Sequence, residues 1–341
     1  MSKIKDFLKK KNVEISFKRY FIDAMGAMAQ GLFASLLIGT IFSTVAVYTK
    51  IEFFETVSAY AKSVSGAAIG VAIASALNAP ALVMFSSAAV GMMGYSEAGA
   101  GPAGAFFAVL VAVELGKLIS KQTRVDILAT PTVTILSGAL VSVGVCPFVG
   151  KLMTLLGNFV NNTTELHPFL MGVVVSVVVG IVLTLPISSA ALCASIGIAG
   201  IAGGAALAGC SAQMIGFAVI SFRENRWNGL LAQGLGTSML QMGNIIRRPV
   251  IWLPVTLASA ITGPVSTMIF KLQCVGVSAG MGTCGLVGPI GAIAAPGEKN
   301  ATFWIGLVLV CFVLPAVLSL LFNELFRKIG LIRDGDMKLD L

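Results

Sequence analysis

The chain has 341 residues, of which 57% are hydrophobic and 11% charged, and its mean hydropathy is +0.94. A soluble domain carries about 25% charged residues, so this composition excludes a soluble globular protein and indicates an integral membrane protein. The formal net charge of +8 does not indicate nucleic-acid binding, because Lys and Arg cluster at the chain ends and in short loops, as the positive-inside rule describes.

The N-terminal 23 residues are basic and amphipathic and lack the apolar core of a cleavable signal peptide. Seven Lys or Arg precede the first predicted span, residues 24–48, so we expect residues 1–23 in the cytoplasm. Residues 49–62 mix charged and aromatic side chains and are expected to form an interfacial helix outside.

The apolar run 64–93 is interrupted by Asn78, Ala79 and Pro80. A single crossing would place the basic loop that follows the next span, 102–120, outside the cell. We therefore predict a re-entrant hairpin or two short tilted spans, which keep that loop inside. Broken backbone at membrane depth is tolerated where it is buried in protein or lines a cavity. Asn78 either satisfies carbonyls freed by the break or faces a solute, and Glu97, in the Gly-rich loop 94–102, is either an exposed loop acid or a solute contact.

The middle of the chain is expected to cross outward at 127–149 and to form an exterior loop at 150–167. Residues 168–222 contain no charged residue, and their length suits three spans or one span and a hairpin.

The C-terminal third contains two further predicted spans, 250–271 and 302–323, on either side of a second broken, glycine-rich element at 275–295. The fold class is thus an all-α polytopic membrane protein with about 8–10 transmembrane helices. It is expected to form a single transmembrane domain over 1–341 that ends in a solvated cytoplasmic tail, 324–341.

Both ends of the chain show the order span, broken glycine-rich element, span. One interpretation is an internal repeat, as in transporters with discontinuous helices. The other is that Pro and Gly are common in membrane helices generally.

The stretch GTSMLQMGNIIRRPVIWLP, residues 236–254, joins two apolar runs. Thr237, Gln241 and Asn244 recur at helical spacing, and Pro249 should bend the chain. One interpretation is an amphipathic cytoplasmic segment with a positive anchor. The other is a half-helix that points its amides into a solute cavity. The candidate solute contacts are Asn78, Glu97, Gln241, Asn244 and Thr283, and Arg247 and Arg248 are candidate phosphate-facing residues.

The other ionisable and sulfur side chains indicate no catalytic constellation. Glu114 either pairs with Lys117, one turn further on, or has a function within the membrane. The six cysteines are single and lie in apolar or glycine-rich stretches, as small buried residues do. Because His167 is the one histidine, no histidine cluster for a metal can form. We expect no catalytic residue, metal or cofactor.

Four long stretches carry a resemblance to a known family: TRVDILATPTVTIL (123–136), HPFLMGVVVSVVVGIVLTLPISSAAL (167–192), LAQGLGTSMLQMGNIIRRPVIWLPVTLASAITGPVSTMIFKL (231–272) and VSAGMGTCGLVGPIG (277–291). Together they resemble the membrane IIC-type component of the bacterial sugar phosphotransferase system, in the branch that includes the perfringolysin O regulator of clostridia. The Gly-Ile-Thr-Glu motif of glucose-type members is absent, so no site residue is carried over from the family.

The resemblance implies a multi-pass permease of the bacterial cell membrane, with both termini cytoplasmic, that binds a sugar-like solute. Separate A and B proteins of the phosphotransferase system would supply the phosphoryl group, so this chain would at most be the membrane subunit of a phosphotransferase complex. The alternative is a membrane sensor that controls gene expression without transport. IIC-like proteins resemble dimers, and Gly and Ala allow close helix contacts, so we expect a homodimer.

Overall fold

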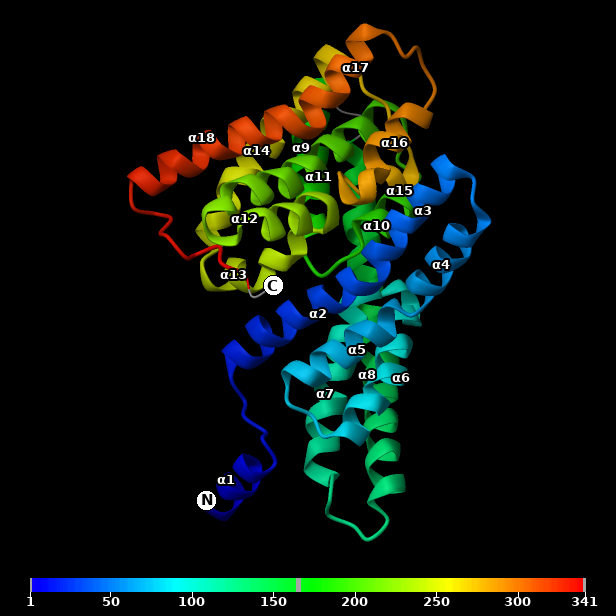
Figure 1. The fold of residues 1–341 in the computed structure, drawn as a ribbon, viewed down its shortest axis with the longest axis vertical. Helices are drawn as coiled ribbons and strands as arrows, with labels where there is room; N and C mark the ends of the chain where they lie inside the picture. The colour runs from blue at the N-terminus through cyan, green and yellow to red at the C-terminus, as the bar shows by residue number, and fades with distance from the viewer. Residues whose placement is uncertain (1, 164–166, 340–341) are drawn as a thin grey trace. The chain divides into compact units, whose positions relative to one another are not determined.

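The structure, a computed structural model, describes residues 2–163 and 167–339. In this part of the chain the secondary structure is helical, which confirms the predicted all-α fold class (Figure 1). The chain forms two compact units. The first unit comprises Met1–Gly39 and Thr56–Leu152, and the second comprises Thr40–Glu55 and Met153–Leu341.

The first unit is a set of packed helices around a helical hairpin. Its elements are α1 (Ser2–Lys10), η1 (Arg19–Ala24), α2 (Met25–Leu32), η2 (Phe33–Leu37), α5 (Ser65–Ala76), α6 (Ala81–Ser96), η3 (Glu97–Gly99) and α7 (Gly101–Ile119). The long helix α8 (Asp126–Thr163) begins in this unit, while α3 (Ile38–Thr49) and α4 (Glu52–Ser63) cross its boundary with the second unit.

The hairpin confirms that the run 64–93 is broken at its Asn-Ala-Pro sequence. Helix α5 ends at Ala76 and α6 begins at Ala81, and the two helices pack against each other. Their contact is close because of glycine: a Cβ built at Gly70 would lie 2.1 Å from the Ser87 carbonyl oxygen. The Ser87 hydroxyl in turn donates to the Gly70 carbonyl at 3.0 Å.

The second unit is built around α11, which packs against α9, α14 and α18 (Figure 1). Its helices are α9 (Pro168–Thr184), α10 (Ser189–Ser195), α11 (Gly200–Ile220), α12 (Phe222–Leu231), α13 (Met242–Arg247), α14 (Leu253–Pro264), α15 (Gly276–Ala279), α16 (Val287–Ala294), α17 (Ala301–Val308) and α18 (Leu314–Lys328). Short 3₁₀ and π segments connect them, among them η4 (Ala232–Gly236), η5 (Ser238–Gln241), η6 (Pro249–Trp252) and η8 (Cys284–Leu286).

Two loop expectations require correction. The exterior loop predicted at 150–167 is helical as far as Thr163, because α8 continues through it. The tail after α18 is only partly solvated: most of its described residues are exposed, but Ile332 and Met337 are 2% and 0% exposed and belong to a core cluster of the second unit. Apolar side chains at these two positions, which sequence reading treated as part of a charged tail, explain the difference.

Six helices within 2–163 and 167–339 are long and apolar enough to cross a membrane. They are Arg19–Ser43, Gly101–Ile119, Asp126–Leu152, Gly200–Ile220, Pro249–Phe270 and Ala301–Lys328. The pair α4 and α5, bent by 50°, makes a seventh if it counts as one span. This is fewer than the 8–10 expected, because apolar segments such as α5, α6 and α9 are shorter helices. The element 275–295 is broken, as predicted, into α15, η8 and α16.

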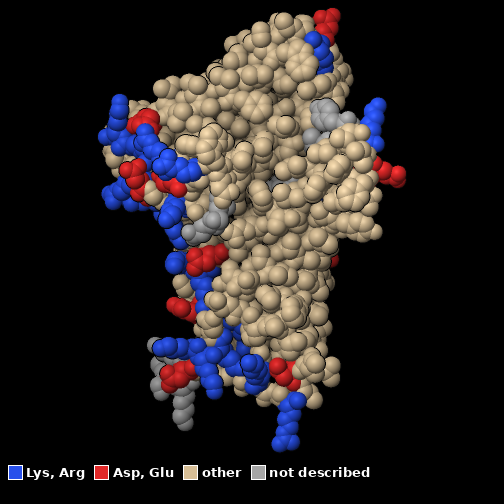
Figure 2. All heavy atoms as spheres, in the orientation of Figure 1, with Lys and Arg blue, Asp and Glu red and all other residues tan. Residues whose placement is uncertain are grey.

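Uncharged side chains cover most of the face drawn in Figure 2. In the first unit, Lys and Arg gather around α1 and the turn between α7 and α8. In the second unit, they gather around α12 and the C-terminal end of α18. An apolar surface bordered by cations fits a protein that lies in a bilayer.

Glycine controls the approach of α11 to α9, and this can be tested. A Cβ at Gly209 would lie 1.9 Å from the Ser176 carbonyl oxygen, whereas a Cβ at Gly144 in α8 would meet nothing within 4 Å. We expect Gly209→Ala to reduce the free energy of unfolding by about 1–3 kcal/mol through overpacking. Gly144→Ala should leave it unchanged or raise it by up to about 1 kcal/mol, since Gly is unfavourable inside helices. Thermal unfolding in detergent measures both, and equal melting temperatures would contradict the close approach.

Candidate functional site

The segment between η4 and α14 is a chain of short helical pieces separated by breaks. Thr237 is extended (φ −158°, ψ 142°), and its hydroxyl accepts a hydrogen bond from the Met239 amide at 3.1 Å, so it caps η5. Arg248 is non-helical (φ −139°, ψ 81°) just before Pro249, which confirms the predicted bend. Thr237 therefore does not lie on one helical face with Gln241 and Asn244, because it precedes the helix rather than belonging to it.

The amides of Gln241 and Asn244 lie together, as their spacing predicts. The Asn244 Nδ2 donates to Gln241 Oε1 at 2.8 Å and to the Lys338 carbonyl at 2.9 Å. The Gln241 Nε2 donates to Gln233 Oε1 and to the Met337 carbonyl, each at 3.0 Å. Gln241 is 0% and Asn244 9% exposed. The two candidates thus form part of a buried amide cluster with Gln233.

Thr283 joins the second broken element to the same region. Its hydroxyl donates at 2.6 Å to the carbonyl of Gly234, the residue next to Gln233 in η4, and its side chain is fully buried. A carbonyl in a short π segment lacks a regular helical partner, and a buried carbonyl without a partner is costly. Three of the five predicted solute contacts, Gln241, Asn244 and Thr283, therefore surround η4.

A second buried polar cluster was not predicted, and Gln213 on α11 is its centre. Its Oε1 accepts from Trp252 Nε1 at 2.9 Å and from the Thr184 hydroxyl at 3.2 Å. Its Nε2 lies 3.4 Å from the hydroxyl oxygens of Thr256 and Ser259. A lone glutamine in a charge-free apolar helix was the available signal, because a polar side chain is expensive there unless it has partners.

The segment η5 connects the two clusters. The hydroxyl of Ser238, its first residue, lies 2.7 Å from that of Thr184 in the Gln213 cluster. Gln241, its last residue, belongs to the amide cluster. A broken piece of chain inside the second unit is thus held at both ends by uncharged hydrogen-bonding side chains.

In the first unit, the structure does not bring Asn78 and Glu97 together. Asn78 lies in the turn before α6, with a positive φ of 52°, and its side chain is exposed. Glu97 follows α6, in η3, and is half-buried. Since α6 has 16 residues, about 24 Å of helix separates them. One small solute therefore cannot contact both side chains in this arrangement.

The carbonyl at the break between α5 and α6 accepts hydrogen bonds from two positively charged side chains rather than from Asn78. The Leu77 carbonyl accepts from Arg19 Nη2 at 2.6 Å and from Lys117 Nζ at 3.2 Å. Lys117 Nζ also lies 3.0 Å from both carboxylate oxygens of Glu114, whose carboxylate takes a further hydrogen bond from Tyr20. The pairing interpretation of Glu114 is confirmed, and the pair closes the C-terminal end of α5.

The predicted phosphate-facing arginines differ in their surroundings. The Arg247 side chain is exposed, whereas Arg248 is half-buried and its Nε lies 3.6 Å from Asp336 Oδ1. His167 caps α9, with its Nδ1 accepting from the Phe169 amide at 3.4 Å, so it acts as a helix N-terminal residue. All six cysteines are buried thiols. The described residues contain no group of three or more His, Cys, Asp or Glu that could hold a metal.

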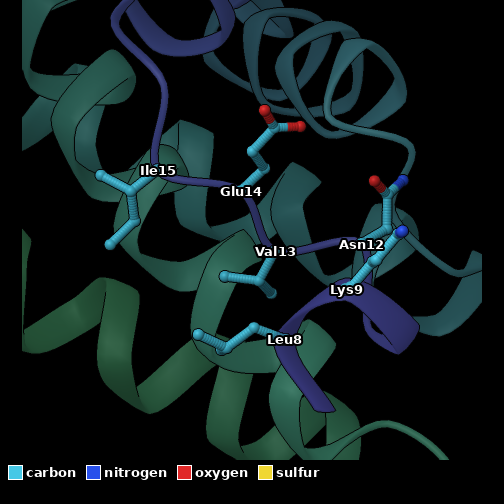
Figure 3. Close-up of a pocket in the computed structure, with 6 residues that line it drawn as sticks. All are labelled: Leu8, Lys9, Asn12, Val13, Glu14 and Ile15. Atoms are coloured by element: carbon cyan, nitrogen blue, oxygen red, sulfur yellow. The ribbon is translucent and has the colours of Figure 1, made fainter. Parts of the chain in front are cut away.

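Open hollows lie elsewhere in the described part of the chain. One, of about 540 Å³, is lined by Leu8, Lys9, Asn12, Val13, Glu14 and Ile15 beside α1 (Figure 3). Nearby, Lys11 donates to the Ser120 carbonyl, and burial lowers the pKa of its ammonium group. Another hollow, of about 370 Å³, lies where the chain turns at 269–273 and 296–303 in the second unit. Neither contains a predicted solute contact.

Comparison with known proteins gives one match. The family described as "Phosphotransferase system, EIIC" matches residues 22–339, which cover most of both units and contain all seven predicted site residues. No curated protein and no solved structure matches the chain.

The ion pair in α7 gives a testable prediction for the first unit. Removing one partner of a buried pair leaves the other charge uncompensated and costs about 3–5 kcal/mol. Lys117 is 1% exposed, so Lys117→Ala should lower the melting temperature strongly, while Lys121→Ala, at an exposed position, should not. Thermal unfolding in the same detergent compares them. Similar melting temperatures would mean that the Leu77 carbonyl and Glu114 do not depend on Lys117.

Proposed function

Because the chain belongs to the EIIC family of the phosphotransferase system, it is a membrane permease component for sugar transport, and we propose that its solute binds at the amide cluster of the second unit. The observation that carries this proposal is the cluster itself: the side-chain amides of Gln233, Gln241 and Asn244 are buried together at breaks between short helices of a chain that is 57% hydrophobic.

The chemistry of the cluster fits a sugar-like solute. Hydroxyl-rich molecules need several donors and acceptors at once, and a side-chain amide offers both. Such groups are costly inside a membrane protein and are kept there where they have a function. Gln241, Asn244 and Thr283 are the proposed contacts. Asn78 and Glu97, in the first unit, remain proposed contacts. Because α6 separates them, the proposal is that the solute contacts them at different stages of its transport.

We infer that the solute is phosphorylated by separate A and B proteins on the cytoplasmic side, where both termini are proposed to lie. Arg247 and Arg248 follow the amide cluster directly in sequence, at the end of α13. A guanidinium group matches the geometry of a phosphate or a phosphorylated partner side chain. The exposed Arg247 is the better placed of the two to meet a soluble protein.

The solute site is tested by substitution of its amides. We expect Asn244→Ala to weaken binding of the true solute by about tenfold or more, because a solute hydroxyl then loses a buried partner worth roughly 1–3 kcal/mol. Thermal stabilisation of the purified protein by a panel of sugars, polyols and sugar acids identifies the solute and measures its affinity. Glu97→Gln should weaken binding similarly if Glu97 contacts solute in the bound state.

Arg247→Ala is the matched control, since it lies three residues from Asn244 on the same short helix. It should keep solute affinity and impair phosphorylation by cytoplasmic donor proteins. Unchanged affinity in the Asn244 and Glu97 variants would place the site elsewhere. Binding without flux into vesicles would favour a membrane sensor over a permease.

We further propose a homodimer. The chain is poor in charge and rich in Gly, and small residues permit close contact between helices of two copies in a bilayer, where packing rather than the hydrophobic effect drives association. Native mass measurement in mild detergent and in lipid discs should give twice the 35.2 kDa mass of the chain. A monomer under both conditions would refute this.

A further inference from the structure

The C-terminal segment 332–339, which we name the strap, is folded back into the second unit. It follows a turn at Gly330 (φ 75°) and contains a second turn at Gly335 (φ 91°). Ile332 lies between the two turns and Met337 lies after the second. Both side chains insert into the core cluster formed by Phe217, Ile220, Ile245, Ile251 and Val255. The strap is thus anchored by two apolar side chains.

Three side-chain amides bind the strap through its main chain. Asn225 Nδ2 and Gln241 Nε2 both donate to the Met337 carbonyl, at 2.8 and 3.0 Å. Asn244 Nδ2 donates to the Lys338 carbonyl at 2.9 Å, and the Leu339 amide donates to Asn225 Oδ1 at 2.8 Å. Two consecutive carbonyls therefore occupy a site made of amide donors.

Ion pairs hold the turn of the strap. Asp336 lies near Arg248, and Arg327 on α18 contacts both Asp334 and, at 2.8 Å, Glu224. The Gly335 amide also donates to Glu224 at 3.3 Å. The contacts of Asp334 and Asp336 are partly exposed and add little on their own, and the buried Arg327–Glu224 pair lies outside the strap, so the apolar anchors and the amides provide most of the attachment.

The amide hydrogens of the proposed solute site are fully used in this state. A side-chain NH₂ has two hydrogens. Those of Gln241 go to Gln233 Oε1 and the Met337 carbonyl, and those of Asn244 go to Gln241 Oε1 and the Lys338 carbonyl. A solute can gain a donor from either amide only when one of these acceptors leaves, and for each amide one of the two acceptors is a strap carbonyl.

We propose that the strap is an intramolecular competitor of the solute: it occupies the donors of Gln241 and Asn244 in the closed state and must detach before a hydroxyl-rich molecule binds there. This inference rests on the proposed solute site. Detachment is physically accessible, because a short segment outside any helix, with glycine turns before and within it, can open at a free energy well below that of global unfolding.

The test uses full-length protein in lipid nanodiscs and variants of the strap that leave every amide in place. Met337→Ala removes an apolar anchor but keeps the carbonyl, and Asp336→Asn weakens the contact with Arg248 without creating a cavity. Lys338→Ala is the matched control, since its side chain is exposed and its carbonyl remains. Hydrogen–deuterium exchange of 332–339 reports detachment, and titration with a fixed panel of hexoses, hexitols and hexuronates reports affinity.

We expect Met337→Ala to speed exchange in the strap about tenfold or more and to raise the affinity for the panel member that binds by a similar factor, because a larger fraction is binding-competent. Asp336→Asn should also speed strap exchange and raise the sugar affinity, but by smaller factors. Lys338→Ala should change neither the exchange rate nor the affinity. In the parent protein, that sugar should itself accelerate strap exchange.

Two results would overturn the inference, and they have different meanings. If a sugar binds the parent and the Met337 variant with equal affinity while strap exchange differs, strap and solute do not compete, and the proposed function stands. If no panel member binds any variant, even with the strap loosened, the solute site itself is refuted and the competition with it.

Discussion

The structure depends on one constraint: inside an apolar environment, each backbone group released by a helix break needs a partner from the protein. The break after α5 meets it with cations, since Arg19 and Lys117 both donate to the Leu77 carbonyl. In the second unit the break at η4 meets it with a hydroxyl, since Thr283 donates to the Gly234 carbonyl. Charged side chains satisfy the carbonyl at the break after α5. An uncharged side chain satisfies the carbonyl at η4, which is compatible with the neutral solute that we propose for that site.

Polar side chains that satisfy a break can also recognise a ligand, and we propose that the second unit combines the two roles. Ser238 and Gln241 terminate the same short segment and belong to different buried clusters. A movement of η5 would therefore change the partners of Thr184 and of Gln233 together. Discontinuous helices near a binding site are a general means by which transporters couple local rearrangement to ligand binding.

Hydropathy and spacing predicted the apolar spans, the break at Pro80 and the proximity of Gln241 to Asn244, because these depend on nearby residues. The same reasoning did not show that Asn78 and Glu97 lie apart, although the intervening apolar run 81–96 is long enough for a helix that separates them. Partners such as Met337 and Lys338, which lie 96 and 94 residues beyond their amides, depend on tertiary folding and have no local signal. The tail was expected to be solvated because its charged residues outnumber Ile332 and Met337, the two apolar residues that are buried.

The strap offers a physical reason why a solute site can be buried and yet ready to bind. An empty amide cluster in an apolar protein would leave donors unpaired, at roughly 1–3 kcal/mol for each. Main-chain carbonyls satisfy those donors when the solute is absent, and solute oxygens can replace them one for one. The exchange then conserves the number of hydrogen bonds, so solute affinity is set by the difference between two bound states rather than by the full strength of either.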